Sequence, residues 1–463
     1  MTAWSLAEVA KQLDATLVGD PGIVPQALSL DTRTLKRGDC FVALRAERDG
    51  HDFASQALGK GAAALLVDHE LDLPVAQLVV SDTTLALQRW GQARLEACRP
   101  GAVFGVTGSV GKTSTKELLA AAIGAWKTPG NRNNTLGLPE ALATLPEGQL
   151  AVVLEMGMST AGEIRRLVEI APLDFGLITN VGIAHAENFP QGPEGIARAK
   201  GELVEGLKSG ASWVHLASDA WCHWIALQPW AKHTRPVAVG DGCAYGWEAL
   251  RSLGPRGEAF HFRTPRTAIE VRLRLRGAHQ VRNACLAAAV ADLGGFPLEV
   301  IASGLGTLEP EPGRGRLHAL KQGGWLMDET YNASQDSILA CAAALLTLDG
   351  GETVAVLGCM RELGAESERI HRETGEGLKR LGIRRVLVYG DQANPLAMGF
   401  GPGASPFPDF EAMREDPSGL GSLADGARIL VKGSRFWQSE RAVAWLLERF
   451  GDPPPVRSAS ILG

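Results

Sequence analysis

Short apolar runs recur along the chain, and each ends in a glycine or a polar residue before an amphipathic stretch begins. Such runs cover residues 103–107, 151–155, 176–180, 353–357, 385–389 and 428–432. A continuous apolar run bounded by turn residues is typical of a parallel strand, because both of its faces are buried. The pattern therefore predicts βα units in two groups. A helical N-terminal stretch and two strands, one within residues 31–44 and one at 62–67, form a separate first part.

Length and turn composition indicate several domains of the α/β class. A chain of 463 residues is too long for one ordinary core. We place one boundary at Arg99-Pro100 and another in the Pro/Gly-rich segment 309–313, which we expect to act as a hinge. A Trp-rich and turn-rich stretch, 213–265, separates the central strands from a helix expected over 283–293. The predicted domains are residues 1–99, 100–311 and 312–463.

Charge and cysteine usage narrow the class of protein. The formal charge is −6, with both signs spread along the chain, which argues against a surface built for nucleic acid. The seven cysteines form no C-x-x-C pair and are expected to be reduced. The N-terminus does not resemble a secretion signal, and no apolar stretch has membrane-spanning length. We expect a cytoplasmic protein that neither inserts into membranes nor binds nucleic acid.

The strongest chemical signal is the glycine-rich segment 105–114, Gly-Val-Thr-Gly-Ser-Val-Gly-Lys-Thr-Ser. It follows an apolar strand and precedes a helical stretch, which is the context that a phosphate-binding loop requires. Backbone N–H groups would surround the phosphates, Lys112 would supply a positive charge, and Thr113 would offer its hydroxyl to Mg²⁺. Val106 stands where the usual pattern has its first glycine. The predicted nucleotide-binding residues are Gly108, Ser109, Gly111, Lys112, Thr113 and Ser114.

Two of the neighbouring strands also end in residues that bind metals. Glu155 ends the apolar run 151–155, and His185 follows the run 176–180. The carboxyl ends of parallel strands form the ligand-binding edge of such sheets. Carboxylate oxygen suits Mg²⁺, and histidine is a common metal ligand. We therefore predict that Glu155 and His185 bind a metal beside the phosphate loop, although a single His is more often structural.

Lys200 lies on the apolar stripe of a predicted helix, with Ile196, Leu203, Val204 and Leu207. Burial would lower the pKa of its amine, leaving it neutral and able to react with carbon dioxide. The spacing alone favours instead a lysine whose stem crosses the stripe to reach water.

Together these residues resemble the Mur ligases of bacterial cell-wall synthesis, along nearly the whole chain. The third-domain motifs point to the branch that adds D-alanyl-D-alanine. The motifs that carry the resemblance occupy residues 31–33, 38–44, 49–53, 105–114, 128–139, 155–164, 180–185, 199–202, 328–333, 357–371 and 432–435. The chain departs from the family at Gln280, Cys359 and Ser334-Gln335, and it is one residue short between Arg45 and Asp49.

The resemblance implies a UDP-sugar domain, a central ATPase domain and a C-terminal Rossmann-like domain. It also implies ATP and Mg²⁺ as cofactors, with UDP-N-acetylmuramoyl-tripeptide and D-alanyl-D-alanine as substrates, and we expect a monomer. Lys200 would be the carbamylated lysine of the family and a metal ligand with Thr113, Glu155 and His185. His279 and Asn283 would face the adenine and Asp328 the ribose. Arg314, or alternatively Arg316, would reach the γ-phosphate. The implied substrate-binding residues are Ser29, Asp31, Arg33, Asn133 and Asn134.

The resemblance, added to the residue pattern, implies an ATP-dependent amide ligase that works through an acyl phosphate, with Lys112, Lys200, His185 and Arg314 as catalytic residues. The alternatives are a related ligase for another amine, such as lysine, diaminopimelate or glutamate, a phosphate-loop kinase or nucleotide-gated binding module, and a non-catalytic relative.

Overall fold

The computed structural model describes residues 4–182, 186–416, 420, 423 and 425–451. The chain forms two compact units. The first comprises Met1–Val181, Glu194–Cys243 and Leu286–Ile301, and the second comprises Gly182–Pro193, Ala244–Cys285 and Ala302–Gly463. No helix among the described residues is long and apolar enough to span a membrane. The three predicted domain ranges stay a prediction.

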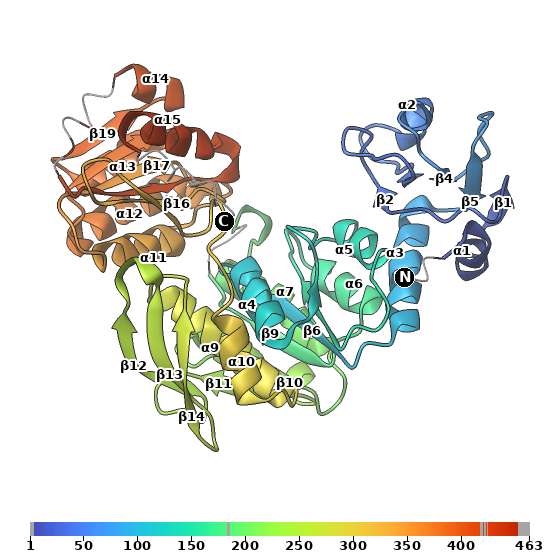
Figure 1. The fold of residues 1–463 in the computed structure, drawn as a ribbon, viewed down its shortest axis with the longest axis horizontal. Helices are drawn as coiled ribbons and strands as arrows, with labels where there is room; N and C mark the ends of the chain where they lie inside the picture. Colours follow the sequence, from blue (N-terminus) through green and yellow to red (C-terminus); the bar gives the residue numbers. More distant parts are fainter. Residues whose placement is uncertain (1–3, 183–185, 417–419, 421–422, 424, 452–463) are drawn as a thin grey trace, which may run out of the picture. The chain divides into compact units, whose positions relative to one another are not determined.

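The N-terminal part of the first unit is a small sheet with helices on both faces (blue in Figure 1). Its strand order is β1-β5-β4-β3-β2, and only β1 runs antiparallel to its neighbour. Cys40 and Val42 pack with α1 and α3, whereas Phe41 and Ala43 pack with α2. This alternation explains the unbroken apolar run. The elements are α1 (Leu6–Leu13), β1 (Thr16–Val18), β2 (Leu28–Ser29), β3 (Cys40–Val42), α2 (Ala54–Gly59), β4 (Ala64–Val67), β5 (Ala76–Val79) and α3 (Thr83–Cys98).

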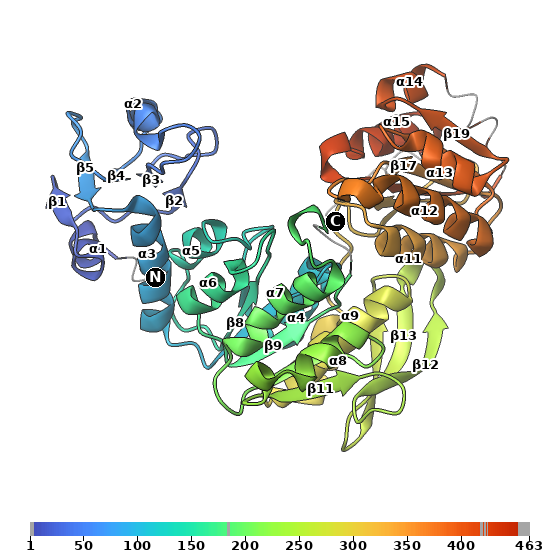
Figure 2. The same cartoon turned by 180° about the vertical axis from the view of Figure 1, so that it is seen from behind.

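The rest of the first unit is built on a six-stranded, all-parallel sheet of order β11-β10-β9-β6-β8-β7. Helix α4 covers one face, and α7 and α8 cover the other (Figures 1 and 2). The strands are β6 (Ala102–Thr107), β7 (Trp126–Lys127), β8 (Ala151–Glu155), β9 (Phe175–Ile178), β10 (Ser212–Leu216) and β11 (Arg235–Val239). The helices are α4 (Lys112–Ile123), α5 (Gly137–Leu142), α6 (Glu163–Ile170), α7 (Pro193–Glu205) and α8 (Ala220–Leu227).

The order of this sheet determines where a ligand can bind. After β6 the chain builds β7 and β8 on one side, and it then crosses to build β9 on the other. The carboxyl end of β6 therefore lies at a switch point, where α/β sheets bind ligands. The predicted phosphate loop follows β6, and Glu155 ends β8.

The second unit contains an antiparallel meander and a six-stranded sheet. The meander is β12 (Gly246–Ser252), β13 (Glu258–Arg263) and β14 (Ala268–Leu273). The sheet has the order β15-β16-β20-β17-β18-β19, with β15 alone antiparallel. Its strands are β15 (Arg316–Ala319), β16 (Trp325–Glu329), β17 (Thr353–Gly358), β18 (Arg385–Tyr389), β19 (Ala404–Phe407) and β20 (Arg428–Lys432).

Helices cover both faces of this sheet. One face packs against α11 (Gln335–Leu346), α12 (Ser367–Leu381) and α13 (Ala393–Phe400), and the other packs against α14 (Phe410–Glu415) and α15 (Glu440–Phe450). Val354 and Val356 face one layer, and Ala355 and Leu357 face the other. Helices α9 (Ala278–Leu293) and α10 (Leu298–Leu305) precede the sheet in the chain. The α/β class and the parallel strands predicted from the apolar runs are confirmed.

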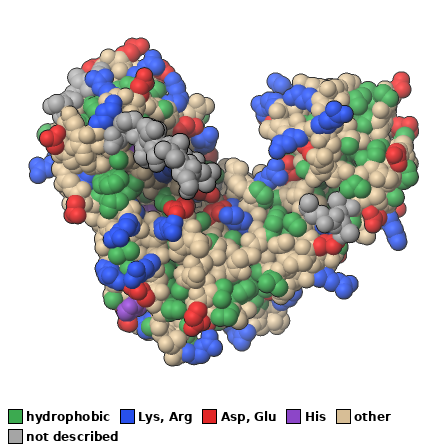
Figure 3. Space-filling view, viewed as in Figure 1, with side chains coloured by type: hydrophobic (Ala, Val, Ile, Leu, Met, Phe, Trp, Pro, Cys, Tyr) green, Lys and Arg blue, Asp and Glu red, His purple; other side chains and the backbone are tan. Residues whose placement is uncertain are grey.

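Basic and acidic side chains are interspersed over the face drawn in Figure 3. This agrees with the mixed charge pattern of the sequence. A monomeric state and the lack of a nucleic-acid partner stay predictions.

Candidate nucleotide and metal site

The phosphate loop joins β6 to α4, and its glycines take conformations that other residues rarely adopt. Gly108 has φ 149°, and Gly111, the residue before α4, has φ 84°. A Cβ on Gly108 would lie 1.9 Å from Thr179 Oγ1. Glycine at 108 therefore allows the loop to approach the end of β9. Thr113 and Ser114 lie half-buried in the first turn of α4, whose N–H groups are suited to bind an anion.

Residues at the end of β9 hold this loop in shape. Asn180 Oδ1 accepts hydrogen bonds from the N–H groups of Ser109 and Val110, at 3.1 and 2.9 Å. The Thr179 hydroxyl donates to the Val110 carbonyl at 2.6 Å. Lys112 Nζ folds back over the loop and donates to the carbonyl oxygen of Gly108 at 2.7 Å. The loop is thus preformed, with a cation above it.

Glu155 lies beside the loop at the end of β8, with 2% of its surface exposed. Its Oε1 accepts a hydrogen bond from Asn133 Nδ2 at 2.8 Å. Its Oε2 is buried and accepts no hydrogen bond from any described residue, but it lies 3.5 Å from the Nζ of Lys116. A buried carboxylate oxygen with spare acceptor capacity fits a Mg²⁺ ligand, as does the hydroxyl of Thr113.

Lys200 is buried in α7, with 2% of its surface exposed, as its spacing predicted. Within the described part of the chain, no hydrogen bond or ion pair involves its amine. Burial lowers the pKa of Lys200 well below its usual value, and the positive charge of Lys112 lowers it further. Burial therefore favours the neutral, nucleophilic form of this amine. His185, the other predicted metal ligand, lies outside the described residues.

The predicted substrate residues of the first unit fall in two places. Ser29 is buried and donates to the Asp31 carbonyl at 3.0 Å, while Asp31 pairs with exposed Arg33 at 2.6 Å. The second place is the segment 128–134, where Asn133 contacts Glu155. Asn134 Oδ1 accepts from the N–H of Gly137 at 2.8 Å, at the start of α5.

The second unit holds the remaining predicted residues. Asp328 is buried and accepts hydrogen bonds from Gly313 N at 2.8 Å and Thr330 Oγ1 at 2.7 Å. Asp328 thus fixes the turn at Gly313. The Arg314 guanidinium lies 3.6 Å from the centre of the Tyr331 ring, whereas Arg316 is exposed at the start of β15.

His279 and Asn283 lie on α9, one turn apart. Asn283 Nδ2 donates to Gln280 Oε1 at 3.2 Å. Burial lowers the pKa of His279 to about 4, and the charges of Lys432 and Arg282 add to this effect. The imidazole of His279 is therefore neutral near neutral pH and available to a ligand. Ligand atoms of His279, Glu329 and Cys341 lie within 4.8 Å of one another.

Sequence inspection missed three residues of the first unit's site: Thr179, Asn180 and Lys116. Asn180 lies two residues past the end of β9, so the strand-end argument used for Glu155 could have found it. Lys116 is completely buried, and it shares an apolar stripe of α4 with Leu119 and Ile123. The spacing argument applied to Lys200 could have found it.

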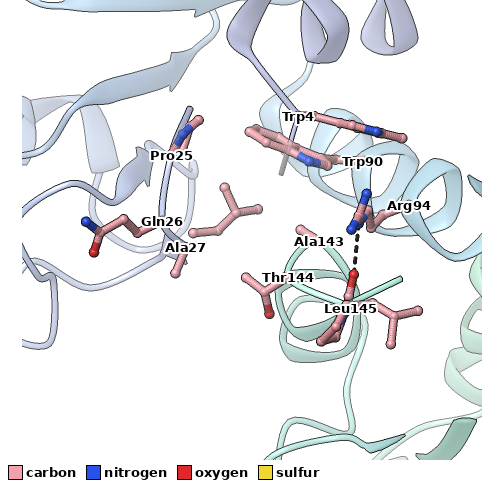
Figure 4. A pocket seen from close by; sticks show the side chains of 11 residues that line it. Trp4, Pro25, Gln26, Ala27, Trp90, Arg94, Ala143, Thr144 and Leu145 are labelled. Carbon is pink, nitrogen blue, oxygen red and sulfur yellow. Dashed lines mark hydrogen bonds between the residues drawn. The ribbon is translucent and has the colours of Figure 1, made fainter. Parts of the chain in front are cut away.

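A separate hollow in the first unit contains none of the predicted site residues (Figure 4). The rings of Trp4 and Trp90 lie on one side of it, and Thr144 and Gln26 lie on others. Buried Arg94 donates to the Leu145 carbonyl at 2.9 Å. The Arg94 guanidinium is thus hydrogen-bonded to the backbone at the edge of the hollow.

Comparisons with known proteins point to one family. Residues 106–291 match the family model of the Mur ligase middle domain, and residues 314–435 match that of the Mur ligase, glutamate ligase domain. The chain is 36% identical to UDP-N-acetylmuramoyl-tripeptide–D-alanyl-D-alanine ligase of Escherichia coli (strain K12), covering 97% of this chain and 99% of that protein. The Bacillus subtilis (strain 168) protein of the same name is 33% identical, covering 86% of this chain and 87% of its own.

Solved structures give the same result. A crystal structure of MurF from Acinetobacter baumannii has a TM-score of 0.88 and 31% identity, covering 96% of this chain and 99% of that one. The structure of MurF ligase from Thermotoga maritima in complex with ADP has a TM-score of 0.79 and 28% identity, and the match covers 91% of this chain and 97% of that one.

Proposed function

Because the chain belongs to the Mur ligase family, we propose that it is an ATP-dependent ligase that adds D-alanyl-D-alanine to UDP-N-acetylmuramoyl-tripeptide. Relatives at 32–36% identity carry the name of this activity, which supports it over ligation of another amine. The observation that carries the proposal is the convergence of the phosphate loop with buried Glu155 and Lys200 in one unit.

The chemistry requires activation of a carboxylate, because oxide is too poor a leaving group for direct attack by an amine. A carboxylate oxygen of the tripeptide attacks the γ-phosphorus of ATP, and ADP leaves. The dipeptide amine attacks the carbonyl carbon of the acyl phosphate, and the resulting tetrahedral intermediate expels phosphate as the amine loses its proton. One ATP is consumed for each amide bond.

The residues of the first unit suit the phosphoryl transfer. Lys112 lies over the loop, where its ammonium would move from the Gly108 carbonyl to the phosphate oxygens. Such a charge lowers the barrier when negative charge builds up in the transition state. When bound, Mg²⁺ would offset charge on the phosphates, and Thr113 and Glu155 are the described residues that would hold it.

Lys200 suits a further role. Its neutral amine would attack carbon dioxide, forming an N–C bond and losing one proton to give a carbamate. The buried lysine would then present negative oxygen atoms, which a Mg²⁺ ion prefers to an ammonium group. The depressed pKa of Lys200 supports this step.

A product assay tests the proposal. The protein is incubated with ATP, Mg²⁺, UDP-N-acetylmuramoyl-tripeptide and one amine at a time, and the products are identified by mass spectrometry. We expect an amide product, ADP and phosphate in equal amounts with D-alanyl-D-alanine. Phosphate release with lysine or glutamate but not with the dipeptide would exclude the proposed amine. ATP turnover with no amide product would indicate a kinase or a binding module.

A further inference from the structure

Lys116 is a buried cation in the second turn of α4, and no part of the proposed mechanism uses it. Its side chain has no exposed surface. Its Nζ donates to the carbonyl oxygens of Thr128 and Gly130, at 2.9 and 2.8 Å. Both carbonyls belong to the segment 128–134, which connects β7 to α5 and carries Asn133 and Asn134. Lys116 thus ties this segment to the helix that begins at the phosphate loop.

Two carboxylates compensate the buried charge. Glu117 Oε1 lies 3.3 Å from Lys116 Nζ, and Glu155 Oε2 lies 3.5 Å from it. An isolated ammonium in a protein interior costs several kcal/mol unless charges and acceptors surround it. Here two carbonyls and two carboxylates do so. Lys116 is therefore held in one place, and it holds its partners in turn.

The same segment is bound on its other side to the end of β8. Glu155 N donates to Thr128 Oγ1 at 3.1 Å, Asn133 Nδ2 donates to Glu155 Oε1 at 2.8 Å, and Gly157 N donates to the Asn133 carbonyl at 2.8 Å. The strand fixes Thr128 and Asn133, and α4 fixes Thr128 and Gly130. Without Lys116, the two hydrogen bonds from α4 to the Thr128 and Gly130 carbonyls would be lost.

We propose that Lys116 is a positioning residue that sets the segment 128–134 relative to the phosphate loop, and so places Asn133 and Asn134 to receive the carboxylate end of the UDP-linked peptide. The inference rests on the proposed function for the identity of this substrate. Attack on the γ-phosphate requires the carboxylate to be aligned within about 3–3.5 Å, and displacements of about 1 Å cost rates on the order of a hundredfold. A buried tether between the two binding elements provides this alignment.

The test measures the two ligands separately. Lys116→Met keeps most of the length of the side chain, which becomes one atom shorter, and removes the donors and the charge. Titration calorimetry should show UDP-N-acetylmuramoyl-tripeptide binding weakened by about tenfold or more, and kcat lowered, because the segment is no longer held. The affinity for ADP and the KM for D-alanyl-D-alanine should change by less than about threefold. Equal weakening of tripeptide and ADP binding would overturn the inference, as would unchanged tripeptide binding.

Lys127→Met is the matched control. Lys127 on β7 also pairs with Glu117, whereas the hydrogen bonds to the Thr128 and Gly130 carbonyls come from Lys116. The Lys127→Met variant should bind the tripeptide as the unaltered protein does. If Lys127→Met loses as much tripeptide affinity as Lys116→Met, the charge balance of Glu117 is the cause, and the proposed role through the segment is contradicted.

A second variant covers the case in which Lys116→Met does not fold, as judged from its melting curve. Lys116→Gln keeps N–H donors for the two carbonyls but removes the charge, and it should bind the tripeptide more tightly than any variant without donors. If Lys116→Gln folds and binds ADP but loses tripeptide binding as fully as Asn133→Ala, the donor role is wrong. If the unaltered protein binds ADP but not the tripeptide, the proposed function fails instead.

Discussion

Replacing Gly108 with alanine tests the geometry of the phosphate loop directly. At φ 149° an L side chain is strained, and the new Cβ would lie 1.9 Å from Thr179 Oγ1 and 3.1 Å from Asn180 N. The Thr179 hydroxyl is not free to move, because it donates to the Val110 carbonyl at 2.6 Å. The variant must therefore break this hydrogen bond or shift the loop.

The expected free-energy cost of Gly108→Ala has two parts, the backbone strain at residue 108 and the loss of the hydrogen bond from Thr179 to Val110. A residue in a glycine-only conformation costs about 1–3 kcal/mol, and loss of the hydrogen bond costs about 0.5–1.5 kcal/mol. If about 2–4 kcal/mol falls on the loop conformation that binds phosphate, the Kd for ADP rises about 30- to 700-fold. Titration calorimetry with ADP and Mg²⁺ measures this change.

Gly124→Ala is the control, because Gly124 follows the same helix at φ 64° with no atom within 4 Å of the added Cβ. It should lose about 1–2 kcal/mol of stability and no ADP affinity. Thr179→Ala in the Gly108→Ala background removes the nearest atom and should recover part of the affinity. The reasoning is refuted if Gly108→Ala binds ADP normally, or if Gly124→Ala loses as much.

Three further predictions concern the titrating and metal-binding groups. Lys200→Ala should lower ligation by at least about a hundredfold, and added short-chain carboxylic acids should restore part of it if a carbamate is needed; near-normal activity would exclude that role. Glu155→Ala should raise the Mg²⁺ concentration at half-maximal rate by about tenfold or more, and an unchanged dependence would show that Glu155 is not a ligand. His279 should make stability depend on pH. Because its pKa is about 4 in the folded protein and 6.5 ordinarily, the unfolded chain binds more protons between these values. The free energy of unfolding should therefore rise with pH from about 4 to 6.5, and denaturant titrations of His279→Asn should show a flatter profile.

Much of the fold was predictable because parallel strands are buried on both faces. The run Thr353–Gly358 is buried at each position, so it stands out from the polar sequence around it. The strands of the meander do not. Residues 246–252 are mostly exposed, and β12 contains an irregularity between Glu248 and Arg251, so its side chains follow no regular alternation. Residues 246–252 fall in the stretch 213–265, which was predicted only as a turn-rich separator. That stretch holds most of β10 and all of α8, β11, β12 and β13.

The candidate site was predictable where one element determines a residue's place. Lys200 is buried because of its helical spacing, and Glu155 reaches the ligand edge because it ends β8. The contacts of Lys116 depend on carbonyls 12 and 14 residues away, which no local pattern specifies. Two-residue strands such as β2 and β7 likewise exist only through their pairing.

The edge strand β19 of the second unit affects how readily this protein aggregates at high concentration. Strand β19 ends the sheet order, and the carbonyls of Gly403 and Phe407 accept hydrogen bonds from Val386 and Gly390 of the β18 side. Pro406 is out of phase with them, so its backbone faces the open edge, where it has no N–H to offer. A free sheet edge is a template for aggregation, and proline there blocks the addition of another strand. Pro406 on the edge strand β19 thus helps to prevent newly made chains from aggregating through this edge.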